Sequence, residues 1–108
     1  MDAWNLETID TDRAASRQRY HEFMRAPDLS AGLYVLEAGA PDPQSPHTED
    51  ELYYVVSGTA RVTVGGESQD VSTGSLVFVA ANVPHRFHDI TRRLVLLVVF
   101  GPAEGSRV

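Results

Sequence analysis

The sequence contains no cysteine and no lysine. Without cysteine the chain can form no disulfide, no thiolate nucleophile and no zinc or iron–sulfur centre with sulfur ligands. All nine basic residues are arginine, which also excludes a Schiff base on a lysine and the lysine of a phosphate-binding loop. Several common catalytic groups are therefore ruled out before any motif is considered.

Long apolar runs are missing as well. The longest, residues 94–100, is far too short to cross a bilayer. The first ten residues, "MDAWNLETID", are acidic and polar where a secretory signal would carry a basic flank and an apolar stretch. We therefore expect a cytoplasmic protein with no membrane partner. The net charge of -6 argues against non-specific binding to nucleic acid.

A length of 108 residues with 43% hydrophobic content fits one globular domain. Residues 1–19 are polar, and we expect them to form a separate N-terminal segment. This segment is either a short helix from about Thr11 or a solvated arm; its clustered arginines leave an anion-binding arm as the alternative. Residues 20–108 are expected to form the folded domain.

The rest of the chain reads as strands. Seven or eight short β-rich runs are separated by turns or by the proline-rich loop "APDPQSP". In "ELYYVVSG" the alternation places Glu51, Tyr53 and Val55 on one face of a strand. The run "RRLVLLVVF" is apolar on both faces, as a central strand would be. The pattern predicts an all-β sandwich or barrel.

Two stretches resemble the two sequence motifs of the cupin family. Between Gly39 and Gly58, His47 precedes Glu51 with three residues between them, and six residues separate Glu51 from Gly58. The second stretch runs from Gly74 through "AANVPHRFHD". The resemblance implies a double-stranded β-helix, or jelly-roll barrel, with the site near one mouth of the barrel.

Many cupins bind one divalent metal through three histidines and one glutamate. By the resemblance His47, Glu51 and His85 are metal ligands, whereas Ser45 stands where the family has its first histidine. Two imidazoles and one carboxylate form a facial triad with open positions, which suits Fe(II) and also Mn, Ni or Zn. The alternative is that both histidines are ordinary loop residues beside a solvated acidic turn.

Four further residues are candidates for the pocket. Glu49 has the spacing to replace the missing histidine, although a solvated carboxylate at the rim is the simpler interpretation. Gln44 could reach the metal or a substrate from its loop. Tyr53 and Phe87 are candidates for the pocket wall, although aromatic residues inside a small barrel more often fill the core.

For function we expect a metal-dependent enzyme, either dioxygenase-like or an isomerase, that acts on a small organic molecule. The alternative is a binding module that holds a small ligand without turnover, with or without the metal. The outward positions Leu52, Tyr54 and Val56 would form an exposed apolar stripe in a monomer, so we also expect a homodimer.

Overall fold

The computed structural model describes residues 1–107, which form one helix and six strands. In chain order the elements are α1 (Leu6–Ser16), β1 (Tyr20–Ala26), β2 (Leu29–Leu36), β3 (Asp50–Val64), β4 (Glu67–Ser72), β5 (Leu76–Val79) and β6 (His85–Gly101). All strand pairs are antiparallel. The expected all-β architecture is confirmed.

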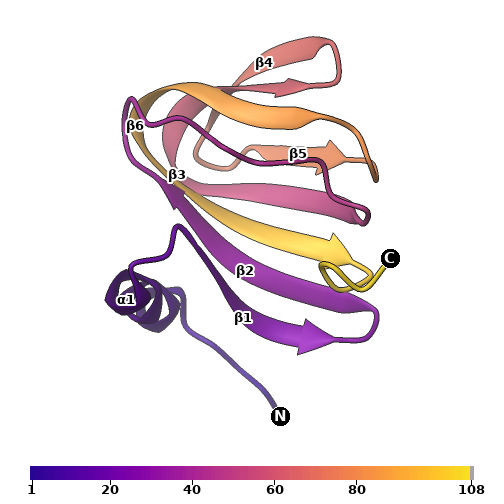
Figure 1. Ribbon diagram of the computed structural model, residues 1–108. Coiled ribbons are helices and arrows are strands. Elements are labelled where there is room, and N and C mark those ends of the chain that lie inside the picture. Colours follow the sequence, from indigo (N-terminus) through magenta and orange to yellow (C-terminus); the bar gives the residue numbers. More distant parts are fainter. Residues whose placement is uncertain (108) are drawn as a thin grey trace.

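The barrel is a single curved sheet with the strand order β1-β2-β6-β3-β4, and β5 pairs with β3 off this path. Strands β3 and β6 are its long central members, and they pair with each other over nearly their whole length. Figure 1 shows the β1–β2 hairpin on one side of the curve and β4 with β5 on the other. The C-terminal segment after β6 lies at the same end of the barrel as the β1–β2 turn.

Two pairs of expected short strands are each one long strand with a bend, so there are six strands rather than seven or eight. In β3 the bend falls at Gly58, whose φ is +106°. A Cβ atom there would lie 2.2 Å from the carbonyl oxygen of Arg93 on β6. Only glycine therefore allows the two long strands to approach this closely and the sheet to fold over.

The core lies inside the curve. Along β3 the inward residues Tyr53 and Val55 are fully buried, whereas Leu52 and Tyr54 are 42% and 39% exposed. On β6 the inward alternation includes Leu94, Leu96, Val98 and Phe100. The residues that alternate in the sequence thus point alternately into the core and toward the outer face of the sheet, as the pleat of a strand requires.

Helix α1 begins at Leu6, earlier than the expected start at Thr11. The side chain of Asn5 caps it by accepting a hydrogen bond from the Glu7 amide at 2.9 Å. Ile9 is its one buried residue, and it packs on Leu33 and Val35 at the outer face of β2. The segment is therefore a docked helix rather than a free arm. No helix within residues 1–107 is long and apolar enough to span a membrane.

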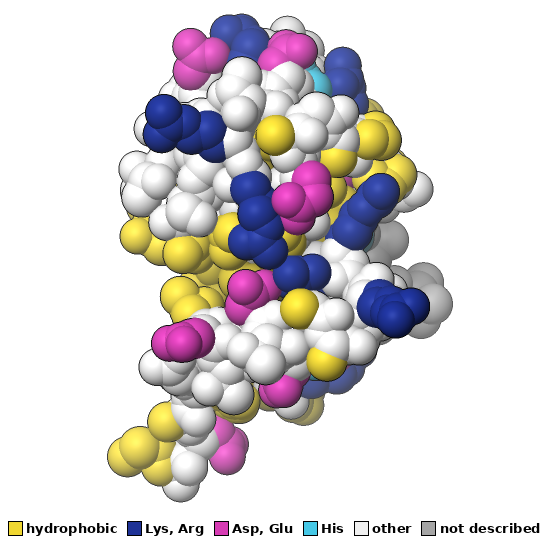
Figure 2. Space-filling view, turned by 90° about the vertical axis from the view of Figure 1, so that its left-hand side faces the viewer, with side chains coloured by type: hydrophobic (Ala, Val, Ile, Leu, Met, Phe, Trp, Pro, Cys, Tyr) yellow, Lys and Arg dark blue, Asp and Glu magenta, His cyan; other side chains and the backbone are white. Residues whose placement is uncertain are grey.

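Figure 2 shows the side of the molecule that carries α1 and the turns next to it. Arginine and acidic side chains are interspersed there, with hydrophobic side chains between them. Arg61 of β3 pairs with Asp70 of β4 at 2.8 Å, and Arg93 of β6 pairs with Glu37, the residue after β2, at 3.0 Å. Both arginines therefore pair with acids from neighbouring parts of the sheet.

Candidate functional site

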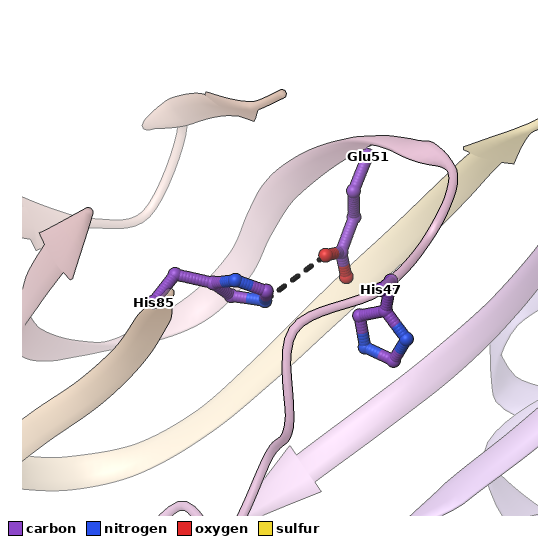
Figure 3. A group of neighbouring side chains, drawn as sticks. All are labelled: His47, Glu51 and His85. Carbon is purple, nitrogen blue, oxygen red and sulfur yellow. Dashed lines mark ion pairs between the residues drawn. The ribbon is translucent and has the colours of Figure 1, made fainter. Parts of the chain in front are cut away.

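Three side chains from different parts of the chain meet near one mouth of the barrel. His47 comes from the loop before β3, Glu51 from the start of β3 and His85 from the start of β6. One ligand atom from each lies within 4.8 Å of the others. Figure 3 shows the His85 ring and the Glu51 carboxylate pointing toward each other, with the His47 ring beside them. Spacing of this order suits three ligands of one ion.

Backbone contacts hold the segments that carry the two histidines. The Asn82 amide donates to the carbonyl oxygen of His47 at 2.7 Å, which joins the His47 loop to the loop before β6. Asn82 has a φ of +67°, a conformation that asparagine tolerates better than most residues. The two loops are therefore positioned against each other independently of the histidine side chains.

The orientation of His85 is set by its own loop. Its Nδ1 lies 2.9 Å from the carbonyl oxygen of Val83, so this nitrogen carries a proton and donates. Its Nε2 lies 3.1 Å from Glu51 Oε1 and 3.2 Å from the Tyr53 hydroxyl. Burial alone lowers the pKa of His85, but the contacts with Glu51 and Val83 outweigh it and raise the pKa above 6.5. A metal ion at Nε2 would take the place of a proton there.

Of the three side chains, Glu51 is in the most unusual environment, because its carboxylate is buried. The residue is 2% exposed, and neither carboxylate oxygen has a hydrogen-bond partner among the described residues. The close approach of His85 does not have hydrogen-bond geometry. A buried carboxylate without partners is costly. The donor set of two imidazoles and one free carboxylate fits a divalent transition metal, and a bound metal would satisfy these oxygens.

His47 is held on its other side by a residue that the sequence analysis missed. Its Nδ1 lies 3.4 Å from Glu104 Oε2, and its ring packs edge-on against Phe100 with centroids 4.8 Å apart. A carboxylate behind a histidine is the usual support of a metal-ligating imidazole. Burial raises the pKa of Glu104, and the neighbouring Glu22, Glu51 and Glu49 raise it further, while His47 opposes the shift.

No fourth side chain completes the set within residues 1–107. Ser45, which stands where the family has its first histidine, is exposed. As a metal site, the arrangement would supply three protein ligands.

A cavity of about 190 Å³ lies beside the triad. Its polar side is formed by Gln44, His47, Glu51 and Glu104. Its apolar side is formed by Tyr20, Tyr34, Val98 and Phe100. An apolar pocket with a few convergent polar groups is the usual form of a small-molecule site.

Gln44 connects the site to a buried hydrogen-bond network. Its Oε1 accepts from the Tyr53 hydroxyl at 2.6 Å, and its Nε2 donates to Asp42 Oδ2 at 2.6 Å. Asp42 also accepts from the Tyr34 hydroxyl at 2.6 Å and from the Phe87 amide at 2.9 Å. The carboxylate of Asp42 therefore ties the proline-rich loop to β2 and β6 and fixes where Gln44 and His47 lie.

The other candidate pocket residues are not part of the cavity lining. Tyr53 is fully buried behind Gln44 and His85, and Phe87 packs edge-on against Tyr53 with centroids 4.9 Å apart. Burial raises the pKa of Tyr53 well above 10.0, with Glu51 adding to it, so its hydroxyl stays protonated. These two aromatics support the site from the core.

Glu49 is neither a fourth ligand nor the solvated rim carboxylate that the sequence favoured, because it is 2% exposed and turns away from the triad to hold the C-terminal segment. Its Oε1 accepts from the Gly105 amide at 3.0 Å, and its Oε2 accepts from the Arg107 amide at 3.4 Å and from the Thr48 hydroxyl. Burial opposes ionisation, but these hydrogen bonds outweigh it and lower the pKa of Glu49 below 4.5. This residue therefore keeps Glu104 beside His47.

Comparison with known proteins gives a consistent family match. The model of the cupin domain matches residues 32–100. The uncharacterized protein SCO3923 of Streptomyces coelicolor is 48% identical over 97% of this chain and 100% of its own length.

Solved structures share the fold at low sequence identity. TT1209 from Thermus thermophilus superposes with a TM-score of 0.76 at 22% identity, over 95% of this chain and 99% of its own. The DMSP lyase DddQ from Ruegeria pomeroyi superposes with a TM-score of 0.69 at 22% identity, over 82% of this chain and 49% of its own.

Proposed function

The chain belongs to the cupin domain family, and from this premise we propose that it binds one divalent metal ion through His47, Glu51 and His85. The observation that carries the proposal is Glu51, a buried carboxylate with two unpartnered oxygens between two imidazoles. The metal would supply a Lewis acid or a redox centre at the cavity. Fe, Mn, Ni and Zn all accept this donor set.

We further propose that the site is catalytic and acts on a small organic molecule in the adjacent cavity. Three protein ligands leave positions open, as in the Fe(II) oxygenases that use two histidines and one carboxylate. Dioxygenase-like chemistry is therefore the first choice. The chain itself would bind the substrate against its aromatic wall, while Tyr53, Gln44 and Asp42 keep the ligand-bearing loops in place.

Oxygen uptake by protein loaded anaerobically with Fe(II) tests this choice. With a panel of small phenols and organic acids, at least one compound is expected to stimulate uptake by wild type and not by Glu51→Gln. Uptake that is the same with and without every compound contradicts dioxygenase-like chemistry.

A binding module without turnover is the second candidate. In its favour, His85 lies 3.1 Å from Glu51, and a protonated His85 would neutralise the buried carboxylate without a metal. A small ligand would then contact Gln44 and Glu104 directly. Ligand binding that is unchanged by a chelator, with no product by mass spectrometry, would support this candidate over the enzyme.

We also propose that the protein is a homodimer. Leu52 and Tyr54 on β3 lie directly opposite Phe78 and Leu76 on β5. These four side chains are between 39% and 67% exposed and form one outer apolar patch. A second copy of the chain would cover this patch. Analytical ultracentrifugation is expected to give a dimer at micromolar concentration, and a monomer with Phe78→Ser; a monomeric wild type contradicts the proposal.

A further inference from the structure

The hydroxyl group of Tyr20 makes no hydrogen bond within residues 1–107. The residue is the first of β1, and its ring packs edge-on against Tyr34 and Phe100, with centroids 6.2 and 6.4 Å away. The hydroxyl oxygen is buried and has no hydrogen-bond partner among residues 1–107. Buried hydroxyls in proteins almost always have a partner, and one without any is costly.

The backbone makes room for this hydroxyl. Tyr20 lies over Gly32 of β2, where a Cβ atom would come within 2.2 Å of its Cζ and 2.3 Å of its hydroxyl oxygen. Gly32 sits within a strand that is apolar apart from Ser30, where a larger residue would pack better. The glycine thus admits the end of the Tyr20 side chain into the wall of the cavity, which Tyr20 lines.

The surroundings keep this hydroxyl a donor. Burial raises the pKa of Tyr20 far above 10.0, and the negative charges of Glu104, Glu22 and Glu51 raise it further. The hydroxyl therefore stays protonated at neutral pH. Its hydrogen needs an acceptor, and neither the described protein groups nor the pairing of β1 with β2 supplies one.

We infer that Tyr20 is a ligand-binding residue of the cavity, and that its ligand is an uncharged, ring-sized organic molecule with an oxygen acceptor. This inference rests on the proposed function only in taking the cavity as the binding site. A cavity of about 190 Å³ is slightly larger than the 150 Å³ cavity that accepts benzene. Tyr34, Phe100 and Val98 supply an apolar surface for the body of such a molecule.

The charges of the lining define the class further. The carboxylates of Glu51 and Glu104 line the cavity, whereas no arginine of residues 1–107 does. A ligand carboxylate would find no cationic side chain and would face two acids. A divalent ion at the triad would offset these two charges, which removes any net attraction for a cationic ligand. An uncharged ligand is compatible with both the metal-free and the metal-bound protein. Its carbonyl or hydroxyl oxygen would accept a hydrogen bond from the Tyr20 hydroxyl.

Benzamide, benzoate and benzamidine test the inference, because they have nearly the same shape and are neutral, anionic and cationic at neutral pH. Binding is measured by NMR titration of isotope-labelled protein. Chelator-treated wild type is expected to bind benzamide more tightly than benzoate, and zinc-loaded wild type is expected to bind benzamide more tightly than benzamidine. Tyr20→Phe is expected to weaken benzamide binding about tenfold, the effect of one lost hydrogen bond. Tyr54→Phe makes the same chemical change on the outer face and is expected to change nothing.

The melting temperature of the ligand-free protein separates a binding role from a structural one. Tyr20→Phe removes a buried group without a partner, so its melting temperature is expected to equal or exceed that of wild type. Gly32→Ala, which displaces the hydroxyl rather than deleting it, is also expected to weaken benzamide binding. The inference would be overturned by wild-type affinity for benzamide in Tyr20→Phe or by a lowered melting temperature of this variant. Tighter binding of benzoate than of benzamide by chelator-treated protein, or of benzamidine by zinc-loaded protein, would overturn it as well.

Titrations with and without zinc distinguish this inference from the metal proposal. Tyr20 is not among the proposed metal ligands, so its effect is expected in chelator-treated and in zinc-loaded protein alike. Protein that binds zinc but not benzamide overturns the ligand inference alone. Protein that refuses zinc but binds benzamide in a Tyr20-dependent way overturns the metal proposal alone.

Discussion

The Nε2 atom of His85 and the Oε1 atom of Glu51 lie 3.1 Å apart, almost sealed from solvent, and do not form a hydrogen bond. Each side chain is 1% exposed. A carboxylate in this position destabilises the metal-free protein, because burial removes its hydration and no hydrogen-bond donor replaces the water. The same carboxylate favours the binding of a metal ion, because the lone pairs of its oxygens are free and already directed toward His85.

Replacing Glu51 by glutamine separates these two effects. Glu51→Gln keeps the volume and removes the charge, so metal affinity is expected to fall by at least the 10–100-fold typical of outer-shell changes. At alkaline pH, where His85 is neutral, the metal-free variant is expected to be as stable as wild type or about 1 kcal/mol more stable. Metal titration and thermal denaturation measure the two quantities.

Asp50→Asn is the matched control for this variant, since Asp50 is the exposed neighbour that accepts from the Ala81 amide. Its metal affinity is expected to equal that of wild type. Equal metal affinity in Glu51→Gln and wild type would remove Glu51 from the ligand set.

The raised pKa of His85 makes the stability of metal-free protein depend on pH. The folded protein holds the proton of His85 more tightly than the unfolded chain, whose value is near 6.5. This contribution to stability is therefore complete below pH 6.5 and is lost as the pH rises through the higher folded value. Urea denaturation of metal-free protein at a series of pH values should show this loss.

The proton on His85 competes with a metal ion for Nε2. Metal affinity should therefore rise as the pH increases from 6.5 through the higher pKa of the folded protein. His85→Gln, which cannot titrate, is expected to abolish the change in stability. Metal-free wild-type protein that becomes more stable across the window would contradict the assignment of this pKa shift.

Glu49 is expected to matter for the C-terminal segment. Glu49→Gln removes the charge that accepts from the Gly105 and Arg107 amides, which should cost about 2 kcal/mol of unfolding free energy. Because the pKa of Glu49 is lowered from 4.5, its contribution in wild type is present above that pH and is lost below it. Hydrogen exchange is expected to quicken at both amides in Glu49→Gln. Unchanged exchange there, or an equal effect in the exposed control Glu67→Gln, contradicts this role.

Gly58 is expected to tolerate no side chain. Gly58→Ala would strain a backbone with φ of +106° and bring a Cβ atom to 2.2 Å from the Arg93 carbonyl oxygen. We expect a loss of about 3 kcal/mol or more in unfolding free energy. At Gly66 an added Cβ meets nothing within 4 Å, so Gly66→Ala should be close to neutral. Similar denaturation midpoints for the two variants would contradict the close approach of β3 and β6.

Local alternation was enough to predict much of the barrel. The inward set of Glu51, Tyr53 and Val55 followed from period-two alternation, because a strand pleat leaves no other choice. The same alternation made Glu49 a candidate ligand on the inward face, and this candidate was wrong. Strand β3 begins at Asp50, so residue 49 lies outside the pleat and its side chain can turn toward the C-terminal segment.

The cavity wall could not be predicted from local patterns. Tyr20 and Tyr34 reach the triad only because the sheet curves and brings β1 and β2 across from the start of β3. Glu104 comes from a short irregular tail with no period, and its place depends on Glu49 and on the Ser30 hydroxyl, which accepts from the Glu104 amide at 2.9 Å. Contacts between segments this far apart in sequence leave no local signal.

The metal content of purified protein tests the central claim most directly. We predict about one transition metal per chain in wild type, and none in His47→Ala or His85→Ala. His88→Ala is the control, because His88 lies on the same strand as His85 but contacts Thr63 and Asp89 instead; it should keep its metal. Wild type that carries no metal and refuses added Fe(II), Mn(II), Ni(II) and Zn(II), or His85→Ala that keeps a full complement, would contradict the account.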